Sequence, residues 1–482
     1  MELIIQNADF EDEKTWKLLS ERRTSGVFQV EGAQYTDLLE NLKIGDINTL
    51  IDSTALIRPG ITDADMLDVY VNRAIGREKI KYDHPLLEPI LKDTKGIFLF
   101  QEQTLMAANK IAGYTLAEAD LFRKAISSKK EDMLAKERGK FVSGCQSVNG
   151  LDEKTANHIF DQIVTFAGYA FNKSHSVCYA LISYWTAYLK ANFPLEYMTS
   201  LLGSQDKEDN IRKYIREAKD SGFKIMPPDI NESLSSFSIA KNSTDTILFG
   251  LSKIKGISDT VAKEVISKRP YTGFLDFLIR TERNLIDSRL VETFLRAGCF
   301  RTIEKKFTTK QILENLDQTL NMLKSDKFIS PHQAAKRSMQ VWEMHQKKRN
   351  KTIEYSDLEF SCMERETMGF YISTHPLKHL KNPEILMSPK YSRIGTMEEA
   401  GRDFYTIGVL ADKVRTRKSR RGTVFSELEI EDELTLLKLP IFGNKHQYIL
   451  EDLKPGDVLA LKMRKSKGKV YTEKMKKIEL GF

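Results

Sequence analysis

The sequence has few cysteines and no long apolar run, and both absences exclude classes of protein. Only four cysteines occur in 482 residues: Cys145, Cys178, Cys299 and Cys362. They lie far apart, so the spacing predicts neither a disulfide scaffold nor a Cys-x-x-Cys metal site. No segment approaches the roughly 18 consecutive apolar residues of a membrane-spanning helix, and the first residues lack the basic and apolar regions of a secretory signal. We therefore expect a protein of the reducing cytoplasm without a membrane partner.

Motifs of several catalytic classes are also missing. The chain contains no P-loop, no His-Glu-x-x-His and no Gly-x-Ser-x-Gly. Two-metal phosphoryl transfer needs clustered carboxylates, but the helical first half has no Asp-x-Asp on a credible strand, and Asp63-Ala64-Asp65 reads as a solvated helix start. We therefore predict no catalytic residue and no metal ligand in this chain, and expect it to bind phosphates rather than to transform them.

The composition is that of a globular protein with an uneven distribution of charge. Hydrophobic residues make up 41% and charged residues 29% of the chain, and at about 100–200 residues per domain two to four domains are expected. The net charge is +7, and residues 401–482 carry 18 Lys and Arg against 12 Asp and Glu. A basic terminal region predicts a polyanionic partner such as nucleic acid; a well-solvated surface is the alternative.

The hydrophobic pattern predicts a multidomain α+β fold. The first two hundred residues have mainly helical periodicity, with a buried helix over 177–193. Pro227-Pro228-Asp229 marks the strongest domain boundary, a compact segment follows to about residue 303, and 305–351 reads as a helical linker. The tail then alternates with period two, which predicts strands over 405–411, 425–430, 437–442 and 458–463. Five or so short strands with glycine-containing turns indicate an OB-like β-barrel, with a small β-sandwich as the alternative.

The densest group of hydrogen-bond donors lies just before the predicted buried helix. Asn172, Lys173, Ser174 and His175 follow one another there. A lysine and an imidazole at a helix start, together with free backbone N–H groups and the helix dipole, form an anion cradle for which a triphosphate is a natural ligand. The alternative is a helix start capped by Ser174 with a solvated Lys173.

Two other basic features lie upstream of this group. Arg123, Lys124, Lys129 and Lys130 fall in one predicted helical stretch, with Arg123 and Lys130 seven residues apart on one face. Such a face can contact phosphates, although an ordinary surface helix would look the same. Arg58 stands in an Arg-Pro-Gly turn that by itself indicates little.

Residues 250–258 show a helix-hairpin-helix pattern, and basic turns occur in the tail. Gly256 would let backbone N–H groups approach a DNA phosphate, and Lys253 and Lys255 would add charge; an ordinary turn is the alternative. In the tail, a predicted basic hairpin carries further candidate DNA contacts: Arg417, Lys418, Arg420 and Arg421.

The motifs taken in order resemble one family, the bacterial DNA polymerase III alpha subunit of the C-family replicative polymerases, from its fingers to its OB-fold. They cover nearly the whole chain, and their combination is far more specific than any one of them. They are Gly26-Val-Phe-Gln-Val-Glu31, Ala55-Leu-Ile-Arg-Pro-Gly60, Phe100-Gln-Glu-Gln103, Ala119-Asp-Leu-Phe-Arg-Lys-Ala125, Phe171-Asn-Lys-Ser-His175, 184–190, Pro227-Pro-Asp-Ile-Asn231, 250–257 and Glu364-Arg-Glu-Thr-Met-Gly369.

The resemblance implies a domain order along the chain. Residues 1–25 would connect palm and fingers, 26–226 would form the helical fingers, and 227–303 the tandem helix-hairpin-helix domain. Residues 304–400 would form a helical linker and 401–482 an OB-fold-like nucleic-acid-binding domain.

The resemblance also implies site roles. Lys173 and His175, with Asn172 and Ser174, would face the triphosphate of a dNTP. Arg123, Lys124 and Arg58 would lie beside them, with Lys129 and Lys130 behind on the DNA side. The family's catalytic aspartates, which hold Mg²⁺, lie in a palm upstream of the residues matched here. The chain would therefore be part of a split polymerase, working with a palm-bearing chain on primer-template DNA.

Some positions depart from the family pattern. Gly32-Ala-Gln-Tyr35 replaces the usual Ser and Gly-Met pair, and Ser128 stands where a glycine precedes paired lysines. A sliding clamp is a candidate partner, although 340–344 and 356–360 are poor matches to a clamp-binding peptide. The rival hypothesis is a non-catalytic DNA-binding module derived from a polymerase, and a decayed remnant is a third reading.

Overall fold

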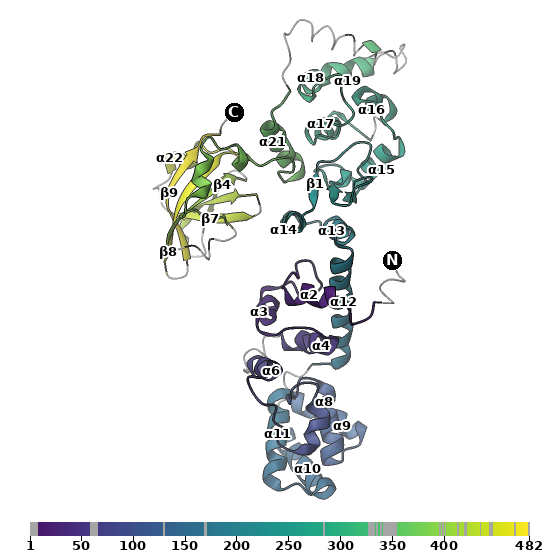
Figure 1. Cartoon of the computed structure of the whole chain (residues 1–482), viewed down its shortest axis with the longest axis vertical. Coiled ribbons are helices and arrows are strands. Elements are labelled where there is room, and N and C mark those ends of the chain that lie inside the picture. Colours follow the sequence, from purple (N-terminus) through teal and green to yellow (C-terminus); the bar gives the residue numbers. More distant parts are fainter. Residues whose placement is uncertain are drawn as a thin grey trace. The chain divides into compact units, whose positions relative to one another are not determined.

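The computed structural model divides into two compact units, Met1–Tyr197 and Met198–Phe482, which are described one at a time (Figure 1). The residues that it describes are 8–57, 66–128, 131–167, 171–282, 285–325, 333, 336, 337, 340, 354–394, 397, 400, 402–411, 414–418, 422–433, 435–442, 447–466 and 469–480.

The described part of the first unit is built from helices. They are α2 (Glu13–Ser20), α3 (Ala33–Asn41), α4 (Ile47–Leu56), α6 (Met66–Ala74), η1 (Pro85–Leu87), α7 (Glu88–Leu91), α8 (Gln101–Ala112), α9 (Leu116–Ser128), α10 (Glu131–Asn149), α11 (Glu153–Ala167) and α12 (Lys173–Asn192). Helix α13 (Pro194–Gly203) contains the division between the units.

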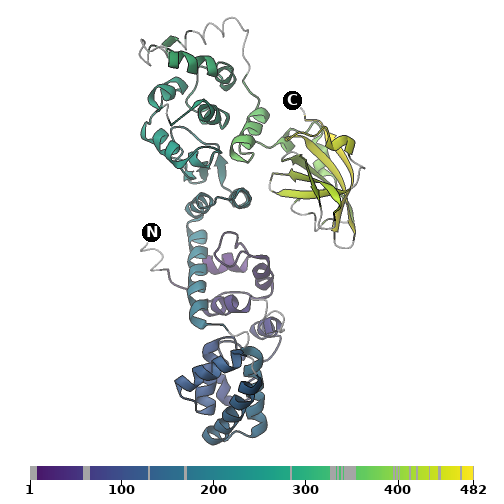
Figure 2. The same cartoon turned by 180° about the vertical axis from the view of Figure 1, so that it is seen from behind.

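Two hydrophobic cores hold these helices together. In the first, α12 packs along α2 and α4, as both views show (Figures 1 and 2), and contributes the fully buried Tyr184. In the second, α8 to α11 enclose a cluster of aromatic rings in which Phe122 stacks on Phe141 at 5.5 Å between centroids. Burial of such large apolar side chains is the main source of stability for helices of this length.

The helix ends follow local sequence signals. Asp152 accepts a hydrogen bond from the Thr155 backbone N–H at the start of α11, as predicted, and Gly113, with φ +71°, ends α8. Helix α12 begins at Lys173 rather than at Val177, because Asn172 caps it by accepting from the His175 backbone N–H. The cap is therefore Asn172 and not Ser174.

The second unit begins with α14 (Glu208–Asp220) and a small sheet. Strands β1 (Lys224–Met226), β3 (Thr246–Leu248) and β2 (Ser238–Ile239) lie in that order, with β1 and β3 parallel. The described short helices that follow are η2 (Leu251–Lys253), α15 (Asp259–Ser267), α16 (Phe274–Arg280), α17 (Ser288–Arg296), α18 (Thr309–Glu314), α19 (Leu316–Ser325), α21 (Asp357–Met368), η3 (Pro376–His379) and η4 (Pro383–Met387).

The predicted helical linker differs from a single helix where it is described. Within 305–325 it forms α18 and α19, because Thr308 opens α18 with a capping box and Asn315 leaves helical geometry at φ −111°. The rest of 305–351 lies almost entirely outside the described residues.

The C-terminal sheet has six described strands. They are β4 (Asp403–Leu410), β5 (Arg415–Lys418), β6 (Val424–Glu431), β7 (Leu436–Phe442), β8 (Val458–Ser466) and β9 (Lys469–Ile478), with the short helix α22 (Gln447–Leu450) before β8. Of these, β4, β6, β7 and β8 are the four that the period-two pattern predicts. The order is β5-β6-β4-β8-β9, with β7 also paired to β6, and every pairing is antiparallel. The sheet curls into a half-barrel (Figure 1) and contributes to two apolar clusters, one of them shared with η3. The predicted multidomain α+β fold is confirmed.

Candidate nucleotide- and DNA-binding sites

The starts of helices α8 and α12 lie side by side. Phe100 and Phe171 form a parallel β-bridge, in which the Gln101 backbone N–H donates to the Phe171 carbonyl at 2.8 Å and the Phe171 N–H to the Leu99 carbonyl at 3.1 Å. Residues 70 positions apart thus present two helix N-termini at one place. Helix N-termini carry partial positive charge, so this junction suits negatively charged groups.

A carboxylate of the chain itself already uses part of this junction. The Glu102 carboxylate accepts from the Lys173 backbone N–H at 3.0 Å and from Asn172 Nδ2 at 3.1 Å. The His175 backbone N–H donates to Asn172 Oδ1 at 2.8 Å. The expectation that free backbone N–H groups would form the cradle is therefore wrong for Lys173 and His175. Any phosphate would be bound mainly by side chains.

The predicted side chains at the start of α12 are exposed. Lys173 Nζ lies 5.7 Å from the centroid of the Phe100 ring. The His175 ring stacks on Tyr179 at 4.1 Å and meets the edge of Phe171 at 5.0 Å. Ser174 is exposed as well. His175 also lines a cavity of about 310 Å³, together with Gln29, Tyr35, Thr54, Ile57, Phe171 and Tyr179.

Arg123 and Lys124 on α9 share one carboxylate. Arg123 Nη2 lies 2.9 Å from Asp120 Oδ1, and Lys124 Nζ lies 2.7 Å from Asp120 Oδ2. These hydrogen bonds, from Lys124 first and Arg123 second, hold the pKa of Asp120 below its ordinary value. Arg123 Nη1 also donates to Gln101 Oε1 at 3.3 Å. Through Gln101 and Glu102, the structure brings Arg123 to the same junction as Asn172 and Lys173.

Sequence reasoning missed a buried carboxylate in this unit. Asp52 on α4 is only 4% exposed and accepts from the Tyr70 hydroxyl at 2.8 Å. Burial raises the pKa of Asp52 to about 7, against the opposing effects of the Tyr70 hydrogen bond and of the Lys95 and Lys173 charges. The polarity of Asp52 within an otherwise apolar helix face was the one available signal. The contact made by Glu102 was also not predicted, and the available signal was that Glu102 is an acidic residue in the first turn of α8.

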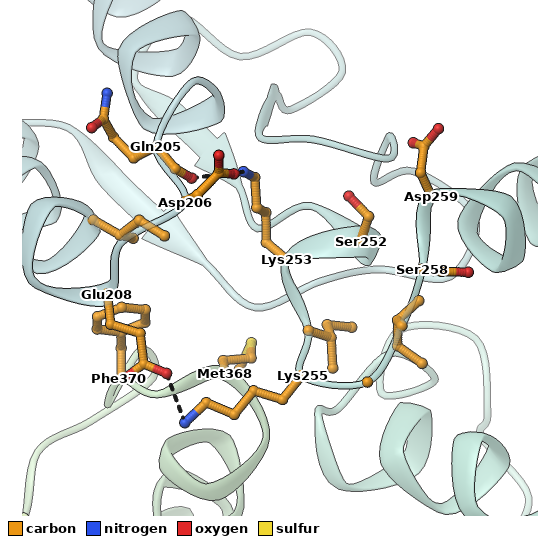
Figure 3. Close-up of a pocket in the computed structure, with 14 residues that line it drawn as sticks. Gln205, Asp206, Glu208, Ser252, Lys253, Lys255, Ser258, Asp259, Met368 and Phe370 are labelled. Carbon is orange, nitrogen blue, oxygen red and sulfur yellow. Dashed lines mark hydrogen bonds and ion pairs between the residues drawn. The ribbon is translucent and has the colours of Figure 1, made fainter.

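The helix-hairpin-helix segment holds its lysines differently from the expectation (Figure 3). Lys253 is only 16% exposed, and its Nζ donates to the Gln205 carbonyl at 2.7 Å with Asp206 Oδ1 at 3.4 Å. Lys255 Nζ pairs with Glu208 Oε1 at 3.0 Å and remains about half exposed. Lys253 is therefore a structural lysine here, while Lys255 keeps access to solvent.

Gly256 does lie in the conformation that its role requires. Its φ is +84°, in the left-handed region, and open space surrounds the position of an added Cβ. The turn then enters α15, which Ser258 caps by accepting from the Val261 backbone N–H. The turn lines a cavity of about 630 Å³, and Figure 3 shows Lys253, Lys255 and Ser258 along it.

On the curled sheet, both described candidates lie on β5. All four residues of β5 are exposed. Arg417 pairs with Glu427 across the hairpin, with Nη2 at 3.1 Å from Oε1, and Lys418 faces solvent. Five predicted contacts lie outside the described residues: Arg58, Lys129, Lys130, Arg420 and Arg421.

The described part of the chain has neither a cluster of metal ligands nor a helix suited to span a membrane. No group of three or more His, Cys, Asp or Glu residues there could hold a metal ion, and none of its helices is both long and apolar enough to cross a membrane.

Comparison with known proteins now adds to this geometry. Residues 1–149 match the profile of the bacterial DNA polymerase III alpha subunit finger domain, and residues 222–309 match a helix-hairpin-helix motif. By these matches the chain is related to the bacterial DNA polymerase III alpha subunit. The resemblance that the motifs indicated, from fingers to C-terminal sheet, is confirmed.

Individual relatives align with nearly the whole of this chain. The DNA polymerase III subunit alpha of Aquifex aeolicus is 33% identical over 94% of this chain and 37% of its own length. Those of Chlamydia muridarum and Bacillus subtilis are 34% and 31% identical, over 92% and 94% of this chain and 36% and 40% of their own lengths. The chain thus spans somewhat more than a third of these DNA polymerase III alpha subunits.

Proposed function

We propose that this chain supplies the fingers and the DNA-binding part of a replicative DNA polymerase. The reaction is template-directed nucleotidyl transfer from a dNTP to the primer end. The observation that carries the proposal is the convergence of Arg123, Asn172 and Lys173 at the paired starts of α8 and α12, in a chain related to DNA polymerase III alpha subunits.

In this proposal the side chains of the junction bind the triphosphate. Lys173 is exposed, and Arg123 is held by Asp120 and Gln101 with about a quarter of its side chain accessible. Both cations would offset negative charge on the phosphates as it redistributes during transfer. Lys124 would add charge at the rim, while Asn172 would keep the helix start in place. His175 and Tyr179 provide an aromatic wall beside them.

Mg²⁺ would neutralise phosphate charge in such a reaction, but the described residues offer no group to hold it. We propose that the metal-binding carboxylates come from a palm-bearing segment other than the residues that the structure describes. Primer-template DNA would contact the Gly256 turn and β5. A sliding clamp stays a candidate partner.

Reconstitution tests the proposal directly. The chain is mixed with a palm-bearing polymerase polypeptide, primed template, Mg²⁺ and dNTPs, and primer extension is measured. We expect extension only in the mixture. Lys173→Ala should lower kcat/KM for dNTP about ten- to hundredfold, because one charge-assisted contact to the triphosphate is lost. Lys110→Ala, at the other end of α8 and also exposed, should change it less than about twofold. Failure of the two polypeptides to associate contradicts the proposal.

One observation favours the rival, a non-catalytic DNA-binding module. The Glu102 carboxylate binds the Lys173 backbone N–H where a phosphate would otherwise bind. Under this rival, DNA affinity is intact and falls steeply with salt, while Lys173→Ala changes neither DNA binding nor any extension activity.

A further inference from the structure

The second unit contains a cavity of about 610 Å³ that the proposed polymerase sites do not use. It lies between the end of α14, strand β1 and the segment 371–375 that leads into η3. Its charged lining is mostly basic: Lys219, Lys224, Arg301 and Lys378 against Asp357 and Glu433.

Three of the four cations have carboxylate partners. Lys224 Nζ lies 2.8 Å from Asp245 Oδ2, Arg301 Nη2 lies 3.7 Å from Asp357 Oδ1, and Lys378 Nζ lies 3.8 Å from Glu433 Oε1.

Lys219 is the exception among these cations. Within the described residues, its ammonium group has neither a hydrogen bond nor an ion pair, although Lys219 is partly buried. Burial, reinforced by the charge of Lys378, lowers the pKa of Lys219 against the opposing effect of the Glu433 and Glu364 charges. A lysine of this kind gains from an anion that enters the cavity.

His375 supplies a second donor without a partner. Its ring is 6% exposed, and Nδ1 accepts from the Leu377 backbone N–H at 3.2 Å. Burial and the surrounding positive charges lower the pKa of His375 to about 3, so the ring is neutral at physiological pH. Because Nδ1 accepts, the neutral ring carries its proton on Nε2. Nε2 is buried and has no hydrogen-bond partner in the described part of the chain.

We propose that this cavity binds a phosphate group, held by the Lys219 ammonium and the His375 Nε2–H. Both groups are donors, and neither has an acceptor in the described protein. A phosphate has several acceptor oxygens that point in different directions, so it can serve both donors and the rim lysines together. The phosphate group belongs either to a nucleic-acid strand or to a free nucleotide, which share this chemistry.

The test uses the full chain carrying Lys173→Ala, so that binding at the α12 start does not contribute. Inorganic phosphate, dAMP and a short oligothymidylate are titrated calorimetrically. Lys219→Met removes the ammonium. His375→Asn removes the Nε2–H but keeps an acceptor for the Leu377 N–H. Lys213→Met is the matched control, because Lys213 is an exposed lysine on the same helix.

We expect saturable dAMP binding that weakens about tenfold or more in Lys219→Met and His375→Asn, and less than about twofold in Lys213→Met. Competition by oligothymidylate identifies a strand as the source, and its absence identifies a free nucleotide. Thermal unfolding midpoints check that the variants fold; if His375→Asn does not, Lys219→Met decides. The proposal is overturned if no probe saturates, or if Lys219→Met binds as tightly as Lys213→Met.

Discussion

Two buried carboxylates, Asp52 in the first unit and Glu431 in the second, have very different partners. At the α8–α12 junction of the first unit, Lys173 is exposed, and within the described residues the buried Asp52 has one hydrogen-bond partner, a tyrosine hydroxyl. In the second unit, Glu431 on β6 is fully buried but receives Arg212 and Arg365, with Arg365 Nε at 2.5 Å.

This difference distinguishes charges that are available to bind a ligand from charges that hold elements of the fold together. Charges that are incompletely compensated in a folded protein cluster at sites that bind or react, whereas fully paired charges fix the relative position of elements. Arg212 lies on α14 and Arg365 on α21, so Glu431 joins both helices to the curled sheet. Perturbing each kind of charge should therefore change different measurable quantities.

Removing the charge of Glu431 should have the largest effect on stability. In Glu431→Gln, two partly buried guanidinium groups lose a fully buried counter-ion, so we expect the free energy of unfolding to fall by about 3–5 kcal/mol. Urea denaturation followed by circular dichroism measures it. Glu433→Gln, on the exposed side of the same turn, should change it by less than about 1 kcal/mol. Equal effects of the two substitutions would show that the Glu431 pairs are not structural.

Asp52, a buried carboxylate with no arginine partner among the described residues, should make the free energy of unfolding depend on pH. The pKa of Asp52 rises from 3.8 to about 7 on folding, so the folded state binds the extra proton. Stability from this group is therefore present at low pH and is lost as pH rises through about 7, by up to about 4 kcal/mol.

Asparagine cannot ionise, so Asp52→Asn should gain stability relative to the unmodified chain between pH 5 and pH 8. Urea midpoints at the two pH values measure this gain. Asp37→Asn, on the exposed face of α3, is the control and should show no such trend. A constant difference between Asp52→Asn and the unmodified chain at both pH values would contradict the raised pKa.

The sequence predicted the elements better than the contacts of their charged side chains. Period-two alternation located β4, β6, β7 and β8, because strand patterning follows from which face is buried. The β5–β6 pairing also agrees with the predicted basic hairpin. The predicted start of α12 differs from the observed one because Asn172, and not a later residue, caps the helix.

The candidate site was predicted only in part. Asn172 and Lys173 could be singled out because they are neighbours in sequence. Their partner Glu102 is 70 residues away, and only the Phe100–Phe171 bridge brings it there. The contact of Lys253 could not be predicted for the same reason, since the Gln205 carbonyl that binds it is 48 residues distant. Local patterns do not report such long-range partners.

Lys253 and Lys255 offer a sharper comparison within one turn. Lys253→Met removes a buried ammonium from the Gln205 carbonyl, so we expect the free energy of unfolding to fall by about 1–2 kcal/mol. Lys255→Met, which breaks a half-exposed ion pair with Glu208, should lower it by less than about 1 kcal/mol. Both variants remove one positive charge, but only Lys255 is exposed enough to contact DNA. We therefore expect DNA binding, measured at several salt concentrations, to weaken in Lys255→Met and not in Lys253→Met. A weaker DNA affinity in Lys253→Met, without loss of stability, would assign that lysine to DNA instead.

Gly256→Ala should lower stability less than Glu431→Gln does, and we expect it to have a separate effect on DNA binding. An alanine at φ +84° costs about 1 kcal/mol of backbone strain, although no atom lies within 4 Å of the added Cβ. Gly139→Ala provides the contrast, because this helical glycine in α10 also has open space around it. Alanine at position 139 should raise the free energy of unfolding by about 0.5–1 kcal/mol. If Gly256 lets backbone N–H groups approach a DNA phosphate, Gly256→Ala should weaken duplex binding in a filter or fluorescence assay while Gly139→Ala leaves it unchanged. Unchanged DNA affinity in both variants would leave Gly256 with a conformational role alone and would move the expected DNA contact to β5.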